Sequence, residues 1–473
     1  MISRFAKRAV AAAAVTALVA TPVAGASAGS LIRDAEIEAT LRAYADPIFE
    51  AAGLDADAVQ VHIINDPQIN AFVSGGLQMF VHTGLLTAAE KPNEVIGVIA
   101  HETGHIAGGH LVRADEAIEN ATIEMIVGAV VGAAVGVLAK DGRPAVMTQE
   151  MARMIALRNL MTYSRAQEGA ADQTAYRLLE ATGQAPDGMV SFFQVLQRQE
   201  ALSSERQAPY LRSHPLASSR VDAAEAAVAR SAYAGKPDSP EMIMRHQRML
   251  AKLNGYLKPF SQVMRLYPKS DQSVPARYAR AITLYRAAQV DEAVAIMDEL
   301  LAESPHDPFF LEQKAQILYE NGHVAEALPL YRQALGLAPG EPLIRLELAQ
   351  AQIQLAEMAQ GNQQPVDPAL LHAAIDDLTK VMHLESKNAD VYKLLAIAYG
   401  MQGEMAMADL FQAERWLASG DEKKAKRLAE QALSALPVGT PGWLRAQDIQ
   451  FVADQRDEDG YEFTSPVSQA SLQ

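Results

Sequence analysis

The chain has 473 residues, of which 49% are hydrophobic and 21% charged, and it carries a formal net charge of −16 at pH 7. This composition is typical of a soluble globular protein rather than a disordered or multi-span membrane chain, and the length predicts two domains or a domain followed by repeats. The acidic balance argues against nucleic-acid partners, and the absence of cysteine excludes disulfides and thiolate sites.

The N-terminal segment, residues 1–28, is typical of a cleaved secretory signal peptide. Basic residues precede a short apolar run over 9–20, and "ASA" over 26–28 supplies the small residues that a signal peptidase accepts. The run is shorter than the ~20 residues of a membrane span. A mitochondrial transit peptide fits less well, because the basic residues are not spread along an amphipathic helix. We therefore expect the mature protein in a bacterial periplasm.

Residues 29–245 are expected to form the first domain, which is α+β and mostly α-helical. The segment "AVQVHIIND" (58–66) alternates with a period near two, and "GGLQMFVHTGLL" (75–86) resembles a second short strand after two glycines. Together they predict a small sheet beside helices. Helices are expected over 33–52, 93–112, 116–139, 148–180 and 187–202.

The segment "MIVGAVVGAAVGVLA" (125–139) is apolar on all sides and has glycines at four-residue steps. It is too short to span a membrane comfortably. A buried or capping helix of the first domain is the favoured interpretation. A helix that touches the membrane or covers a substrate cleft is the alternative.

The segment "HETGH" has the spacing of a metal site. His101 and His105 are four residues apart, so both imidazoles leave the same face of a helix, as two ligands of one tetrahedral zinc ion require. Glu102 lies beside the first ligand and could take a proton from water without binding the ion. Gly104 in mid-helix costs ~1 kcal/mol relative to alanine, which indicates that backbone or ligand approaches it closely.

A third ligand must come from elsewhere in the chain. The elongated motif with a third histidine six residues after His105 is excluded, because position 111 is leucine. His110 is expected to point away from the ligand face. In "YSRAQEGAAD", Glu168 and Asp172 share one face of a second predicted helix. Glu168 would complete a His/His/Glu set with one position left for water, and Asp172 would hold a ligand imidazole by a hydrogen bond.

Residues 246–440 are expected to form an array of helix pairs. Ala293 and Ala327 are 34 residues apart, and Pro305 and Pro339 repeat the same step. Small residues at helix crossings and a proline after the second helix are typical of tetratricopeptide repeats, whose period is ~34 residues. The same step of 34 residues separates Ala281, Ala315 and Ala349, the small residues of the partner helix.

Residues 441–473 are expected to be a C-terminal tail.

Four segments in order, "INAFVSGGLQMFVHTGLL", "HETGHIAGGH", "YSRAQEGAAD" and "SHPLASSRVD", resemble a known family of zinc metalloproteases. This is the family that contains the CAAX prenyl proteases and the HtpX-type peptidases. The resemblance covers most of residues 35–230. With the repeat array behind it, the chain is similar to the BepA-like periplasmic branch, since no prenyl-protease-like set of transmembrane helices is present.

The resemblance implies a zincin-type protease domain that binds one Zn²⁺ ion. It implies that His101, His105 and Glu168 bind the zinc and that Glu102 is the general base. It also implies that Asn70, Gly75 and Gly76 lie beside the cleft, where a strand edge would hold an extended substrate by main-chain hydrogen bonds.

The histidine–proline segment "SHPLASSR" is also assigned to the catalytic cleft by the resemblance. His214 can reach the metal as a fourth ligand, and Arg220 can steady the cleft. An exposed loop histidine is the competing interpretation of His214. The resemblance places His110 as a structural residue rather than a ligand.

The implied function is a zinc endopeptidase of the cell envelope that degrades misfolded or misassembled outer-membrane proteins. The array would dock substrates or partners such as the outer-membrane β-barrel assembly machinery, with peripheral membrane contact as a further option. The alternative is a chaperone or assembly scaffold whose zinc site is closed and structural, because four protein ligands leave no position for water. The carboxylate of Glu102 favours the enzyme. A zinc hydrolase acting on something other than protein is a third option.

Overall fold

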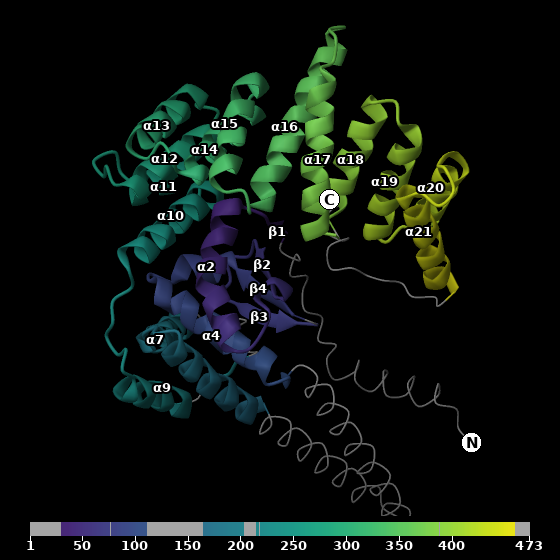
Figure 1. The fold of residues 1–473 in the computed structure, drawn as a ribbon. Helices are drawn as coiled ribbons and strands as arrows, with labels where there is room; N and C mark the ends of the chain where they lie inside the picture. Colours follow the sequence, from purple (N-terminus) through teal and green to yellow (C-terminus); the bar gives the residue numbers. More distant parts are fainter. Residues whose placement is uncertain are drawn as a thin grey trace, which may run out of the picture. The chain divides into compact units, whose positions relative to one another are not determined.

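A computed structural model describes residues 30–75, 77–110, 164–202, 214–216, 218–386 and 388–458 (Figure 1). The chain divides into two compact units. The first comprises Met1–Ile32 and Thr40–His246, and the second comprises Arg33–Ala39 and Gln247–Gln473. The predicted signal segment and the apolar segment over 125–139 lie outside the described residues. In the part of the chain that is described, every helix is too short or too polar to span a membrane.

The first unit contains a four-stranded sheet in the order β1-β2-β4-β3. The central strands β2 and β4 are parallel, and the outer strands β1 and β3 pair antiparallel to them. Both predicted strand segments contribute, although the second is extended only as far as His82 because Thr83–Ala88 forms the helix α3. The strands are β1 (Leu31–Ile32), β2 (Gln60–Ile64), β3 (Ala71–Ser74) and β4 (Gln78–His82).

Helix α4 (Pro92–Ala107) lies in the core of this unit and is buried from its first residue to His105. Its apolar run "EVIGVIA" accounts for that burial. Pro92 occupies the first turn, where a missing N–H costs nothing. The carboxylate of Glu94 accepts a hydrogen bond of 2.7 Å from the backbone N–H of Glu90 and thereby caps the N-terminus of α4.

Further helices surround α4 and the sheet, which confirms the predicted α+β, mostly helical fold class. The predicted helix over 148–180 is described from residue 164, and the one over 116–139 lies outside the described residues. The helices are α2 (Ala35–Ala51), a helix over 164–181, α7 (Asp187–Leu202), α9 (Ser218–Arg230) and the first part of α10 (Pro240–Leu257).

The second unit contains the predicted array of helix pairs (Figure 1). Helices α12, α14 and α16 begin at residues 274, 308 and 342, a constant step of 34 residues. Ala281, Ala315 and Ala349 all have no exposed surface, as the repeat pattern predicts for helix crossings. The helices are α11 (Phe260–Leu266), α12 (Val274–Arg286), α13 (Val290–Glu303), α14 (Pro308–Glu320), α15 (Val324–Leu337), α16 (Pro342–Gly361), α17 (Pro368–Leu384), α18 (Ala389–Met401), α19 (Met405–Ala418) and α20 (Glu422–Ala435).

The prediction of a tail from residue 441 is wrong for its first 18 residues, because Pro441–Glu458 forms the helix α21. Ala446 and Ile449 are buried against the alanines of α20 in one apolar cluster. Their helical spacing places them on one face, and that face packs on the preceding helix as in the other pairs. Residues 459–473 lie outside the described residues.

The first turn of α2 belongs to the second unit and joins a buried charge network there. Lys252 has no exposed surface, and its Nζ atom lies 2.8 Å from a carboxylate oxygen of Asp34 and 3.4 Å from one of Glu312. The Nε atom of Arg248 lies 2.6 Å from Glu36. Carboxylates of this network would be left buried without a cation if the lysine were removed.

Candidate metal centre

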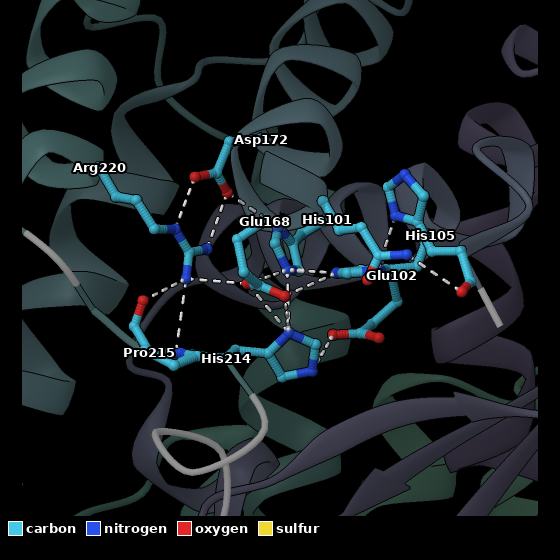
Figure 2. Close-up of polar contacts among 10 residues, drawn as sticks. His101, Glu102, His105, Glu168, Asp172, His214, Pro215 and Arg220 are labelled. Carbon is cyan, nitrogen blue, oxygen red and sulfur yellow. Dashed lines mark hydrogen bonds and ion pairs between the residues drawn. The ribbon is translucent and has the colours of Figure 1, made fainter. Parts of the chain in front are cut away.

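Helix α4 presents two histidines and a carboxylate to one buried point (Figure 2). The Nε2 atoms of His101 and His105 lie 3.1 Å apart. Glu102 has no exposed surface and its carboxylate oxygens make no hydrogen bond with the described residues, although one of them lies 3.5 Å from Nε2 of His214. A buried carboxylate without hydrogen bonds is costly, so its place beside the two histidines indicates a functional role.

The helix over 164–181 brings two carboxylates to the same point. The oxygens of Glu168 lie 3.4 Å from Nε2 of His101 and 3.3 Å from Nε2 of His105. The Nδ1 atom of His101 donates to Asp172 at 2.8 Å. This hydrogen bond places the ring proton on Nδ1 and leaves the lone pair of Nε2 for a cation.

Gly104 is explained by the approach of these two helices. A Cβ atom at this position would lie 2.7 Å from the carbonyl oxygen of Ala171 and 2.9 Å from its Cα atom. Both contacts are with backbone, so no side-chain rotation could relieve them. The predicted close approach at Gly104 is therefore confirmed, and it is the approach that brings Glu168 to the histidines.

His214 joins the site as a further donor. It is 6% exposed, so it is not an exposed loop histidine. Its Nδ1 atom lies 3.0 Å from Glu168 and 3.3 Å from Nε2 of His101. The ligand atoms of His101, His105, Glu168 and His214 all lie within 4.8 Å of one another.

Arg220, on α9, holds both carboxylates and the segment that carries His214 (Figure 2). Its Nε and Nη2 atoms donate to Asp172 at 2.7 and 2.8 Å. Its Nη1 atom lies 2.9 Å from Glu168 and donates to the carbonyl oxygen of Pro215 at 3.1 Å. One guanidinium therefore fixes three parts of the site relative to one another.

The donor set fits a tetrahedral metal ion. Zn–N and Zn–O bonds of ~2.0–2.1 Å place the corners of a tetrahedron roughly 3.3–3.4 Å apart. Five donor pairs of this site lie 3.0 to 3.4 Å apart when either oxygen of Glu168 is counted, and with one atom per residue the four donors lie within 4.8 Å of one another. Imidazole nitrogens with one carboxylate oxygen are donors that suit zinc.

The surroundings of the site lower the pKa of two carboxyl groups and raise that of a third. Burial acts to raise the pKa of Glu168, but hydrogen bonds from His101, His105 and His214 lower it well below its usual range. Burial likewise opposes the hydrogen bonds from His101 and Arg220 that lower the pKa of Asp172. By contrast, burial raises the pKa of Glu102 to about 7. Its carboxyl group can therefore gain and lose a proton near neutral pH.

His110 lies outside the donor set, as expected, but the predicted end of its helix is wrong. Helix α4 ends at Ala107 instead of continuing to residue 112, and Gly109 then turns the chain with a φ of +61°. His110 is brought back so that its Nδ1 atom lies 3.0 Å from Nδ1 of His105. The pair Gly108–Gly109 is the sequence signal that predicts this helix end, since glycine favours the left-handed turn there.

The residues expected beside the cleft lie at the two ends of β3. The backbone oxygen of Asn70, just before the strand, accepts the N–H of His82 at 3.0 Å. Gly75 directly follows the strand, and Gly76 lies outside the described residues. β3 is an outer strand of the described sheet, and it packs against α4, the helix that carries the two histidines.

Comparisons with known proteins agree with this arrangement. Residues 32–228 match the model of Peptidase family M48, and residues 318–362 match a tetratricopeptide repeat. The chain is 25% identical over 382 residues to the beta-barrel assembly-enhancing protease of Yersinia pestis, covering 80% of this chain and 75% of that protein. It is 26% identical to the Escherichia coli K12 protein of the same name, covering 62% and 60%. It is 27% identical to metalloprotease LoiP of Escherichia coli K12, covering 36% and 62%.

Residues 32–228 are therefore similar to the metalloproteases of peptidase family M48, and residues 318–362 are similar to a tetratricopeptide repeat. The four donors and Glu102 all lie within the M48 match.

Proposed function

We propose that the protein is a zinc-dependent endopeptidase in which His101, His105 and Glu168 hold the metal and Glu102 is the general base. The observation that carries this proposal is the carboxylate of Glu102. It is fully buried beside the four donors, none of the described residues donates a hydrogen bond to its oxygens, and Nε2 of His214 lies 3.5 Å from one of them. A purely structural metal site has no use for such a carboxylate.

Each residue of the site has a separate role in peptide hydrolysis. Zinc, when bound, supplies Lewis acidity toward the substrate carbonyl and lowers the pKa of water. Glu102, the neighbour of His101 on α4, takes the proton of the attacking water and later passes it to the leaving amine. Asp172 keeps His101 in the tautomer that faces the metal. An extended substrate adds to the outer edge of β3 between Asn70 and Gly76.

His214 closes the site in this arrangement. Three protein ligands and one open position describe a catalytic zinc site, whereas four protein ligands describe a structural one. The Nδ1 atom of His214 supplies a fourth donor. We infer that this is a resting state and that His214 must leave before a substrate enters. The same observation favours the alternative function, a chaperone or assembly scaffold with a permanently closed zinc site.

The place of action and the clients follow from the sequence and the relatives. The signal-like segment over 1–28 favours export to the periplasm. Two relatives are named beta-barrel assembly-enhancing proteases. We infer that misfolded or misassembled outer-membrane proteins are the substrates. The repeat array would dock these clients or the β-barrel assembly machinery, because stacked helix pairs offer an extended binding surface.

Three purified forms test the proposal: wild type, Glu102→Gln and His214→Ala. Bound zinc is measured by metal analysis, and cleavage is measured on unfolded casein. We expect about one zinc ion per chain in all three forms. Glu102→Gln should not cleave, and His214→Ala should cleave faster than wild type. Zinc without cleavage by any form would favour the scaffold, and the lack of zinc in wild type would refute the metal centre.

A further inference from the structure

A second imidazole, that of His110, contacts the Nδ1 atom of His105. The Nδ1 atoms of His105 and His110 lie 3.0 Å apart, and the two rings meet edge to face with an interplanar angle of 80°. His110 is 6% exposed. It lies outside the donor set and contacts the donor His105.

The position of the protons in this pair follows from the chemistry of imidazole. Nε2 of His105 faces the donor set and needs its lone pair to bind a cation, so the proton of the neutral ring lies on Nδ1. His105 therefore donates to Nδ1 of His110. That atom must accept, which places the proton of His110 on its own Nε2 atom. One contact thus specifies the tautomer of both rings.

The ring of His110 fills the space beside Gly108. A Cβ atom on Gly108 would lie 2.4 Å from Nε2 and 2.8 Å from Cδ2 of His110, so the ring occupies the space that a side chain would take. The carbonyl oxygen of His110 also accepts a hydrogen bond from Nε2 of Gln167 at 3.2 Å. Gln167 precedes Glu168, so the helix that supplies the carboxylate donor also fixes the backbone of His110.

We propose that His110 is a positioning residue of the metal centre, which fixes the ring orientation and tautomer of His105. The inference rests on the proposed metal site and assigns it a second orienting group. Asp172 orients His101 with a carboxylate, whereas His110 orients His105 with a neutral ring. Loss of such an orienting group typically lowers metal affinity by about 10–100-fold.

Three variants test the role of His110. His110→Leu removes the acceptor and keeps an apolar side chain. His110→Gln keeps an amide oxygen that can accept from His105. Gly108→Ala displaces the ring without changing it. His323→Leu is the control, because that histidine lies on the repeat array and is exposed.

The readouts are zinc affinity, measured by competition with a chromogenic chelator, and the visible absorption spectrum of the cobalt-substituted protein. We expect His110→Leu and Gly108→Ala to bind zinc about 10–100-fold more weakly, with an altered cobalt spectrum. His110→Gln should recover most of the affinity, and His323→Leu should match wild type.

The outcomes separate this inference from the proposed function. Unchanged affinity and spectrum in His110→Leu and Gly108→Ala, with normal zinc binding by wild type, would overturn the role of His110 alone. Absence of zinc from wild type would overturn both. If His110→Leu does not fold, as judged by circular dichroism, His110→Gln and Gly108→Ala decide the question by the cobalt spectrum.

Discussion

Replacing Gly104 with alanine tests whether the close approach of two helices builds the metal centre. The added methyl group would meet the backbone of Ala171 at 2.7 and 2.9 Å. Atoms at optimal separation lie ~3.5–4.0 Å apart, so α4 and the helix over 164–181 must separate by roughly 0.5–1 Å. Because neither contact involves a flexible side chain, the separation moves Glu168 away from His101 and His105.

The expected magnitude follows from two opposing effects. Overpacking of this kind costs about 1–3 kcal/mol, while alanine in mid-helix gains about 1 kcal/mol over glycine. The net loss is therefore roughly 0–2 kcal/mol, which lowers the melting temperature by up to roughly 8 °C for a domain of this size class. Displacement of a donor should lower zinc affinity by about 10–100-fold, the range that follows the loss of groups that orient metal ligands. The affinity is thus the more sensitive readout.

Gly169→Ala is the matched control, since it lies on the partner helix and a Cβ atom there has no described neighbour within 4 Å. It should raise the melting temperature slightly and leave zinc affinity unchanged. Both variants are measured by thermal unfolding without metal and by chelator competition. If Gly104→Ala and Gly169→Ala behave alike in both assays, the contact with Ala171 does not build the site and our reasoning fails.

Two further predictions concern stability. Lys252→Ala should destabilise the second unit by about 3–5 kcal/mol, because Asp34 and Glu312 lose their buried cation. The exposed pair of Lys380 and Asp376 gives the control, and Lys380→Ala should cost less than about 1 kcal/mol; equal effects in thermal unfolding would contradict the role of the network. Removal of metal with a chelator should lower the melting temperature, and zinc at about 100 times its dissociation constant should restore about 2.7 kcal/mol. Equal restoration by magnesium would argue against a nitrogen-rich site.

The parts of the molecule that sequence predicts are those encoded by a regular spacing. His101 and His105 share a helix face because they are four residues apart, and Glu168 and Asp172 do so on a second helix. The array was predicted from a 34-residue step that recurs in the starts of α12, α14 and α16. Spacing within an element is a local property, so it can be read without knowledge of the tertiary structure.

The features that were missed depend on short elements or on distant contacts. β1 has two residues, too few to show a period, and the four residues of β3 were expected only as the strand edge that the family resemblance implies. α21 follows the last repeat without the small-residue markers of the earlier pairs. The position of His110 against His105 depends on the left-handed turn at Gly109. The contacts of Arg220 with Asp172 join residues 48 positions apart, which no local pattern encodes.

The assembly of the donor set from distant segments makes activity a late product of folding. The pair of His101 and His214 is separated by 113 residues, and that of His214 and Glu168 by 46. An extended or partly folded chain holds no such set, so a newly made molecule cannot attack its neighbours before its tertiary structure is complete. With the proposed metal bound, metal binding would be coupled to folding, because the four donors come together only in the finished domain.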